Sequence, residues 1–358
     1  MDFNLNSFVR SSLLSLQPYQ SAREEFVNQG RKMILLDANE NPFETNSNRY
    51  PDPLQVELKE RIAKWKRVAP QKLYLSNGSD EFISQLIMCC CEPNRDSILI
   101  LPPTFGMYHV AAKTHNVGVV EAPLTSDFQI DFEKIKSVLT PKVKIIFIPT
   151  PNNPTANSFD NETLHKILSS FTGLVVIDEA YVEFSKEKSF VLQLERYPNL
   201  VVCQTFSKAQ GLAGARLGMA FAHPELILFL NRIKAPYNIN SLTIGTALQR
   251  LNEQDKVQSQ VKYILNERNI LEIELPKISF IEQCYPSDAN FILVKVDNSK
   301  LRYNQLIERG IVVRNPSKNR GCANTLRITV GLAEENKALL NALKNMEEYH
   351  EKSTFYRP

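Results

Sequence analysis

Short apolar runs and longer amphipathic stretches alternate along most of the chain. Apolar runs that end in turn residues predict buried strands, and apolar positions three or four residues apart predict helices. On this basis we expect strands at 33–37, 73–75, 97–101, 143–148, 174–177 and 200–202, with helices at 54–66, 82–90 and 161–170. Strands that alternate with helices predict an α/β fold with a mainly parallel sheet.

The pattern changes near residue 250, where charge density rises along a long amphipathic stretch. Strands expected at 291–296 and 326–330, followed by a last helix at 334–349, predict a smaller α+β domain. A chain of 358 residues is long enough for one large and one small domain. We therefore expect an N-terminal arm (1–40) that packs with the small domain, a large domain (41–250) and a small C-terminal domain (251–358).

Polar or aromatic side chains follow five of the predicted strands. In chain order they are Ser79 with Asp80, Phe105, Asn153, Asp178 with Tyr181, and Ser207 with Lys208. Ligands of parallel α/β sheets bind outside the carboxyl ends of the strands. Because loops are polar by default, one such ending is weak evidence, but five with complementary chemistry predict a binding site at this edge.

The segment 205–218, TFSKAQGLAGARLG, carries the strongest chemical signal. Its hydroxyls and its guanidinium, on Thr205, Ser207 and Arg216, suit a phosphate. Burial and a neighbouring cation would lower the pKa of Lys208 toward that of an amine that attacks a carbonyl. The alternative is a surface lysine in a glycine-rich loop.

A second anion site is predicted where Gly78 precedes the helix expected at 82–90. The backbone N–H groups of Ser79 and Asp80 would lie at the N-terminus of this helix, where unpaired donors and the helix dipole favour negative charge. An ordinary N-cap made by a serine or aspartate side chain is the alternative.

Composition excludes several classes of function. Lys and Arg number 42 against 39 Asp and Glu, a dispersed charge of +3 that does not predict nucleic-acid binding. No apolar run approaches the roughly 18 residues of a membrane span, and the N-terminus does not resemble a signal peptide. The six cysteines lack the spacing of a metal site and suit a reducing cytoplasm.

Two other classes fit poorly. No G-x-G-x-x-G follows an early strand, which argues against a nucleotide-binding dehydrogenase. A regulator with a non-catalytic cofactor module would need an added DNA-binding domain, and an arm of about 30 residues is shorter than the roughly 50 of a small domain.

The pattern S-K-A-x-G-L-A-G-x-R-x-G resembles the lysine segment of fold type I aminotransferases, which hold pyridoxal 5′-phosphate on a lysine. The resemblance narrows to the histidinol-phosphate aminotransferases and covers nearly the whole chain. It is carried by PYQSAR, LDANENP, NRYPDP, SNGSDE, PPTFGMY, TPNNPT, DEAYVEF, KAPYNIN and LRITVG. It implies transamination between L-histidinol phosphate and 2-oxoglutarate, giving imidazole-acetol phosphate and L-glutamate, in histidine biosynthesis.

The resemblance also implies a role for each residue at the strand ends. Lys208 would hold the cofactor and transfer the proton, Asp178 would keep the pyridine nitrogen protonated, and Phe105 would stack on the ring. The ring oxygen would be contacted by Asn153 and Tyr181. The phosphate would be held by Ser79, Asp80, Thr205, Ser207 and Arg216.

Further implied residues concern the substrate and the assembly. Tyr50 would reach the cofactor phosphate of the neighbouring subunit, so that the active unit is a homodimer. Arg327 would bind the substrate anion with help from Arg314 and Tyr19, while Asn39 would line the substrate pocket. The alternative for the two arginines is exposed charge on the small domain.

Two positions depart from the family. Ala156 stands where the family usually has glycine, so the turn there must avoid positive φ or bear strain. Phe105 stands where the family often has tyrosine, which keeps the stacking but loses a hydroxyl. Aromatic or other amino-acid aminotransferases, and a phosphothreonine-type decarboxylase, would share the cofactor residues, and only the substrate pocket would separate these functions.

Overall fold

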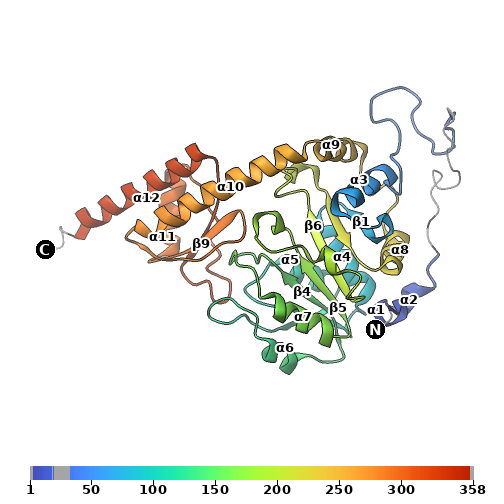
Figure 1. The fold of residues 1–358 in the computed structure, drawn as a ribbon, viewed down its shortest axis with the longest axis horizontal. Helices are drawn as coiled ribbons and strands as arrows, with labels where there is room; N and C mark the ends of the chain where they lie inside the picture. Colours follow the sequence, from blue (N-terminus) through green and yellow to red (C-terminus); the bar gives the residue numbers. More distant parts are fainter. Residues whose placement is uncertain (1–2, 18, 20–32, 355–358) are drawn as a thin grey trace.

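The computed structural model describes residues 3–17, 19 and 33–354, which form a large and a small domain (Figure 1). Its strands are β1 (Leu73–Ser76), β2 (Ser97–Ile100), β3 (Gly118–Glu121), β4 (Val143–Pro149), β5 (Leu174–Asp178), β6 (Leu200–Thr205), β7 (Gly218–Phe221), β8 (Ile281–Cys284), β9 (Phe291–Val296) and β10 (Thr325–Thr329). Its helices are α1 (Leu5–Phe8), α2 (Ser11–Leu14), α3 (Val56–Lys66), α4 (Ser79–Cys90), α5 (Met107–Thr114), α6 (Phe132–Val138), α7 (Asn161–Ser170), α8 (Pro224–Ile233), α9 (Ser241–Leu251), α10 (Gln254–Glu274), α11 (Ser299–Glu308) and α12 (Ala333–Thr354).

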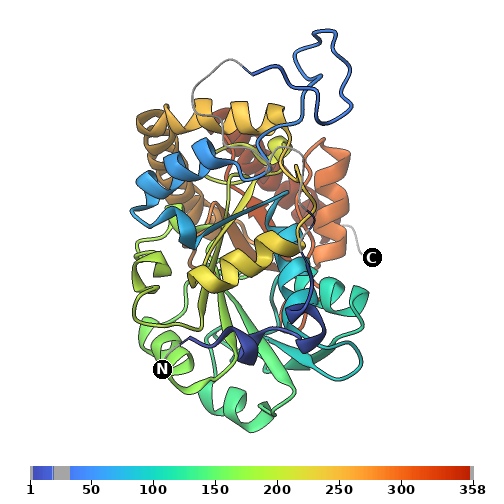
Figure 2. The ribbon, with the colours of Figure 1, turned by 90° about the vertical axis from the view of Figure 1, so that its right-hand side faces the viewer.

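The large domain is built on a seven-stranded sheet of order β1-β7-β6-β5-β4-β2-β3. Strand β7 runs antiparallel to both neighbours, and the other pairings are parallel. Helices cover both faces of the sheet (Figure 2). Alternate strand residues face opposite cores: in β5, Leu174 and Val176 face the core under α4, α5 and α8, and Val175 and Ile177 face the core under α3, α7 and α9. A sheet covered on both sides explains the continuous apolar runs. The predicted α/β class is confirmed.

Four strand assignments differ from the sequence pattern. Residues 33–37, predicted as a strand, adopt no strand, and the segment 33–53 stands out from the body without regular structure (Figures 1 and 2). An apolar run becomes a strand only where a sheet edge can pair with it, and this segment pairs with no strand of the described chain. Strands β3, β7 and β8, each of four residues, were not predicted. Strands β3 and β8 are only partly buried, which leaves little periodicity, whereas β7 is fully buried but too short to stand out as an apolar run.

The small domain is a three-stranded antiparallel sheet of order β10-β9-β8 packed against α10, α11 and α12. Helix α10 runs from the end of α9 into this domain (Figure 1). The guanidinium of Arg268 on α10 donates to the carbonyl oxygens of Phe184 (3.3 Å) and Ala289 (2.9 Å). These bonds hold the small domain against the loop that follows β5. Within the described ranges, no helix is long and apolar enough to cross a membrane.

The beginning of the N-terminal arm packs on the large domain. Apolar side chains of α1 and α2 contact the core formed by α4, α5 and α8. The ring of Phe3 stacks on His223 at 3.9 Å, and the Arg10 guanidinium lies 3.2 Å from the Glu92 carboxylate. For these residues the structure corrects the expectation that the arm packs with the small domain. Residues 20–32 lie outside the described chain, and the boundaries at residues 40 and 250 remain predictions.

Candidate active site

The predicted strand endings converge on one edge of the large sheet. Strands β1, β2, β4, β5 and β6 are mutually parallel, because β1 and β6 are both antiparallel to β7 between them. Their carboxyl ends therefore share an edge, and the loops after them carry the side chains that the sequence singled out. Arg216 lies two residues before β7, which starts at the same edge because it runs in the opposite direction.

The N-terminus of α4 forms the cradle predicted for an anion. Its N-cap is Gly78 at φ +82°, and no side chain caps the helix, so the ordinary N-cap alternative does not hold. A Cβ on Gly78 would lie 2.5 Å from Arg216 Nη2, and a Cβ on Gly218 would lie 2.6 Å from the backbone nitrogen of Ser79. Only glycines allow the guanidinium and β7 to approach the helix end so closely.

Three further side chains, those of Asp80, Thr205 and Ser207, complete this end of the site. Arg216 Nη2 lies 3.3 Å from the Asp80 carboxylate. The Thr205 hydroxyl donates to Ser207 Oγ at 3.0 Å, and the Ser207 N–H donates to Thr205 Oγ1 at 3.1 Å. Because a carboxylate repels a phosphate, Asp80 is suited to offer its backbone N–H while its side chain holds Arg216 in place.

Lys208 lies in the loop after β6, with its amine 5.5 Å from the centre of the Tyr181 ring. The side chain is reachable from solvent, but surrounding protein partly desolvates the amine. This burial, and secondarily the Arg327 guanidinium, lower the pKa of Lys208. The direction is the one predicted, although the main neighbouring cation is Arg327 rather than Arg216.

Asp178 is a buried carboxylate at the end of β5. It accepts hydrogen bonds from the Tyr108 hydroxyl (2.7 Å) and from the Ala180 N–H (3.2 Å). Burial raises the pKa of Asp178 to about 6, and the two donors oppose this shift. Sequence reasoning missed Tyr108, although it lies three residues after Phe105 in the quoted PPTFGMY segment, and the two rings meet edge to face at 5.5 Å.

The next carboxylate along the chain, Glu179, lies apart from this site. It accepts hydrogen bonds from Ser189 Oγ (2.6 Å), the Phe190 N–H (2.6 Å) and Gln204 Nε2 (2.7 Å), and burial raises its pKa to about 7. These contacts tie the loop after β5 to β6. Two adjacent buried acids thus have different partners, and only Asp178 points toward the Tyr108 hydroxyl.

The two arginines expected to bind the substrate anion are neighbours. Arg314 and Arg327 exchange both backbone hydrogen bonds, at 3.0 and 2.8 Å, and directly opposed residues project from the same face. Arg327 Nη1 also donates to Asn153 Oδ1 at 2.5 Å, across the domain boundary. Arg327 is therefore engaged at the site, whereas the Arg314 side chain is exposed.

The remaining predicted residues are not brought to the site of their own chain. Tyr19 (74% exposed), Asn39 and Tyr50 (52% exposed) lie on the surface, and the described structure records no contact between them and Lys208 or Asp178. Tyr50 stacks instead on the ring of Tyr237 at 4.5 Å. Of the segment 18–23, only Tyr19 is described.

Of the two outcomes expected for the turn at Ala156, a negative φ or backbone strain, the structure shows strain. Ala156 is buried and adopts φ +70°, a left-handed conformation that costs an L-residue roughly 1–2 kcal/mol. Its N–H donates to the Asn152 carbonyl and its own carbonyl accepts from the Asp288 N–H, both at 2.8 Å. Ala156 thus adopts a backbone conformation that normally favours glycine.

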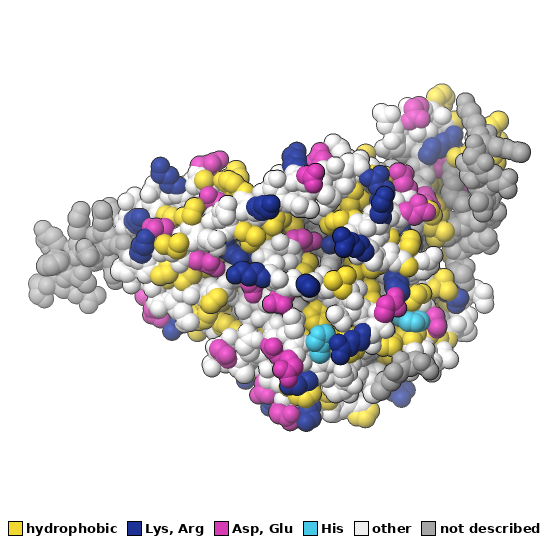
Figure 3. Space-filling view, in the orientation of Figure 1, with side chains coloured by type: hydrophobic (Ala, Val, Ile, Leu, Met, Phe, Trp, Pro, Cys, Tyr) yellow, Lys and Arg dark blue, Asp and Glu magenta, His cyan; other side chains and the backbone are white. Residues whose placement is uncertain are grey.

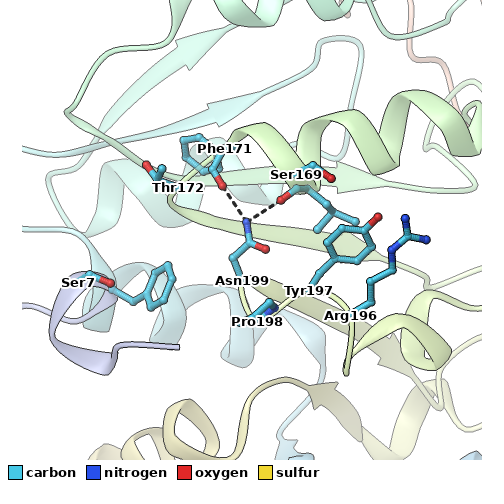
Figure 4. A pocket seen from close by; sticks show the side chains of 10 residues that line it. Ser7, Ser169, Phe171, Thr172, Arg196, Tyr197, Pro198 and Asn199 are labelled. Carbon is cyan, nitrogen blue, oxygen red and sulfur yellow. Dashed lines mark hydrogen bonds between the residues drawn. The ribbon is translucent and has the colours of Figure 1, made fainter. Parts of the chain in front are cut away.

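A separate cavity of about 440 Å³ lies at the opposite edge of the sheet, near the amino ends of β5 and β6 (Figure 4). It is lined by Ser7, Phe8, Leu168, Ser169, Phe171, Thr172, Arg196, Tyr197, Pro198 and Asn199. None of the predicted site residues lines it. On the face drawn in Figure 3, basic and acidic side chains are interspersed, and no basic surface gathers there.

The residues at the carboxyl edge fit a phosphorylated pyridine cofactor. The glycine cradle under Arg216 suits the phosphate, because a Cβ would fill the space beside the helix N–H groups. The buried Asp178 suits a positively charged ring nitrogen, because a buried carboxylate is costly without a partner of opposite charge. Lys208 supplies the amine with a lowered pKa.

Comparison with known proteins agrees with this chemistry. The family model of aminotransferase class I and II matches residues 31–343. A histidinol-phosphate aminotransferase of Christiangramia forsetii is 48% identical over 97% of this chain and 99% of its own length, and one of Parabacteroides distasonis is 49% identical over 96% and 99%. The solved structure of the histidinol-phosphate aminotransferase from Clostridium acetobutylicum has a TM-score of 0.79, with 27% identity over 85% of this chain and 92% of that one. The predicted fold type and resemblance are confirmed, and the chain belongs to the class I and II aminotransferase family.

Proposed function

We propose that this protein is a pyridoxal-phosphate-dependent aminotransferase that interconverts L-histidinol phosphate and 2-oxoglutarate with imidazole-acetol phosphate and L-glutamate, a step of histidine biosynthesis. The observation that carries the proposal is the likeness to histidinol-phosphate aminotransferases at 48% identity over 97% of the chain. The site supports it with a lysine of lowered pKa, a buried carboxylate and a helix-end anion cradle on one sheet edge.

The protein groups have distinct tasks in this reaction. Pyridoxal 5′-phosphate, when bound, supplies the electron sink that makes the C–H bond at the substrate's amine-bearing carbon acidic. Lys208 takes the proton from that carbon as a general base, and its lowered pKa increases the share of neutral amine near pH 7. Asp178 holds the positive charge of the ring nitrogen, and Arg216 with the N-terminus of α4 holds the phosphate.

The substrate side must accept two different anions. Histidinol phosphate carries a phosphate and no carboxylate at its amine-bearing carbon, whereas glutamate carries a carboxylate there. Paired guanidinium groups are suited to a phosphate dianion. Arg314 and Arg327, joined through their backbones, are the pair that this chain offers, and Arg327 is the one already in contact with a cofactor-side residue, Asn153.

We expect Arg327→Ala to weaken both half-reactions and Arg314→Ala to weaken chiefly the one with histidinol phosphate. Charge-assisted hydrogen bonds contribute about 1.5–3 kcal/mol each, so loss of Arg314 should lower kcat/KM for that half-reaction roughly tenfold to a few hundredfold. Single-turnover kinetics of each half-reaction, with wild type and both variants, measure this separation directly.

Arg320 provides a matched control, because it is an exposed arginine in the same part of the small domain. Arg320→Ala should leave both half-reactions within about twofold of wild type. Histidinol, which lacks the phosphate, should react much more slowly than its phosphate. If wild type used histidinol and histidinol phosphate equally, the function of an aromatic or other amino-acid aminotransferase would fit better. The same would follow if Arg314→Ala slowed the half-reaction with glutamate to the same extent. Release of carbon dioxide from a phosphorylated amino acid would instead indicate a decarboxylase.

We also propose a homodimer with shared active sites. The segment 33–53 stands out from the body and exposes a series of large apolar side chains, among them Ile34 (86%), Leu36 (90%) and Phe43 (77%). Apolar side chains of this size are buried in stable assemblies. Tyr50 lies in the same segment, so a partner that covers it would bring Tyr50 near that partner's site.

Mixing two inactive chains tests this arrangement. A Lys208→Ala chain and a Tyr50→Ala chain should form a mixed dimer in which one site has both residues intact. Random exchange should restore roughly a quarter of wild-type sites, because half of the dimers are mixed and each has one intact site. The control mixes Lys208→Ala with Asp178→Asn, which belong to the same site and should show no recovery. Absence of recovery with Tyr50→Ala as well would mean that Tyr50 serves its own chain.

The cellular compartment remains a proposal. All six cysteines of the chain are unpaired thiols, and five of them are buried. Unpaired buried thiols suit a reducing compartment such as the cytoplasm.

A further inference from the structure

Both carboxylate oxygens of Asp178 are held by a protein donor. The Tyr108 hydroxyl donates to Oδ2 at 2.7 Å, and the Ala180 N–H donates to Oδ1 at 3.2 Å. The Ala180 bond is local, since it comes two residues further along the same loop. The Tyr108 bond comes from α5 and joins residues 70 positions apart in the sequence. The orientation of the carboxylate therefore depends on how Tyr108 is placed.

Tyr108 is fixed by the packing of its ring. Its side chain is fully buried in the first turn of α5. The ring stacks on Phe147 of β4 with centroids 4.7 Å apart and planes 16° from parallel, and it meets Phe105 edge to face. A ring held on two sides leaves its hydroxyl one direction in which to point, and that direction is Asp178.

Several charged or titratable groups face Asp178 from the surrounding elements. They are Asp80 on α4, Cys203 on β6, Lys208 after β6, Tyr181 after β5 and Tyr108 on α5. Burial is the largest influence on the pKa of Asp178 and raises it. The strongest opposing influence is the Tyr108 hydrogen bond, ahead of the Ala180 amide and the Lys208 charge.

We propose that Tyr108 is a positioning residue of this enzyme, which holds the Asp178 carboxylate ionised and in one orientation toward the cofactor's ring nitrogen. The proposal rests on the proposed function, in which Asp178 is the partner of that nitrogen. Because Tyr108 also touches Phe105, the segment PPTFGMY would support the pyridine ring of the cofactor at two places. Phe105 would contact the face of that ring, and Tyr108 would act on its nitrogen through Asp178.

Tyr108→Phe removes the hydroxyl and keeps the ring. In the cofactor-free chain, ¹³C NMR of labelled aspartate should show the pKa of Asp178 about one to two units higher than in wild type, which is the loss of one hydrogen bond to a charged group. With ¹⁵N-labelled pyridoxal phosphate bound, the ring nitrogen should lose protonation at a lower pH than in wild type, and the dissociation constant of the cofactor should rise roughly tenfold.

Tyr197→Phe is the matched control. Tyr197 is also buried, and its hydroxyl bonds to His165 Nδ1 at 3.0 Å beside the cavity at the other edge of the sheet (Figure 4). This variant tests the cost of deleting a buried tyrosine hydroxyl without touching Asp178. It should leave the Asp178 titration, the nitrogen signal and cofactor affinity unchanged.

A second variant covers the case in which Tyr108→Phe does not fold. Incorporation of 3-fluorotyrosine at position 108 keeps the shape but makes the hydroxyl a stronger donor, so the pKa of Asp178 should move down rather than up. Unchanged Asp178 and nitrogen titrations in the folded variants would overturn the role of Tyr108, even if cofactor affinity fell. None of these readouts uses a substrate, so failure to convert histidinol phosphate would overturn the proposed function alone. Failure of wild type to bind pyridoxal phosphate would overturn both.

Discussion

Lys208→Ala should abolish transamination, with kcat/KM lower by roughly 10⁴-fold or more, because the variant loses both the covalent anchor of the cofactor and the general base. Lys208 is suited to both tasks by its place after β6 and by the burial that lowers its pKa. Treatment with borohydride should fix the cofactor to wild type and not to the variant, which intact-mass measurement detects.

Two comparisons separate loss of chemistry from loss of structure. Lys186→Ala removes an exposed lysine of the same domain and should retain wild-type rates. A small exogenous amine should partly restore proton transfer in Lys208→Ala if the missing group is a base. A variant that turned over within tenfold of wild type would exclude Lys208 as the catalytic lysine.

Much of the large domain could be predicted because its central strands are buried on both faces. Strands β4, β5 and β6 are nearly continuous in apolar residues, and such runs are visible without knowledge of neighbours. The location of the candidate site followed from the same feature, since the residues after parallel strands must meet at one edge. The order of the strands, with antiparallel β7 between β1 and β6, had no such signal in the sequence.

The contacts that define the site in detail could not be predicted. The Tyr108–Asp178 hydrogen bond depends on how α5 packs against β4, and neither periodicity nor composition encodes that geometry. The same holds for the backbone pairing of Arg314 with Arg327, because Arg314 lies outside any regular strand. The segment 33–37 was wrongly predicted as a strand, because an apolar run indicates burial but does not say which surface covers it.

Asp178→Asn should retain the fold but lower both half-reactions by about two to four orders of magnitude, because removal of one partner of a buried ion pair costs about 3–5 kcal/mol and each tenfold in rate is about 1.4 kcal/mol. The amide of asparagine carries no negative charge, so it does not stabilise the protonated ring nitrogen. Single-turnover rates with glutamate and with histidinol phosphate should fall by similar factors, because the cofactor ring serves both. A variant with wild-type rates would place the partner of the nitrogen elsewhere.

Stability measurements on the cofactor-free chain would distinguish a loss of catalytic rate in Asp178→Asn from a loss of folded protein. Burial raises the pKa of Asp178 from 3.8 to about 6, so the folded chain binds this proton more tightly than the unfolded chain. The contribution of Asp178 to the free energy of unfolding therefore falls as pH rises from about 4 to about 6, by up to about 3 kcal/mol. Asparagine does not titrate, so the variant should lack this decline and should be at least as stable as wild type at pH 7 in urea unfolding.

Asp160→Asn is the control, since Asp160 caps α7 at the surface and asparagine caps equally well. A stable but nearly inactive Asp178→Asn chain beside an active Asp160→Asn chain would assign the carboxylate to the reaction, whereas an Asp178→Asn chain that unfolds would assign it to the fold.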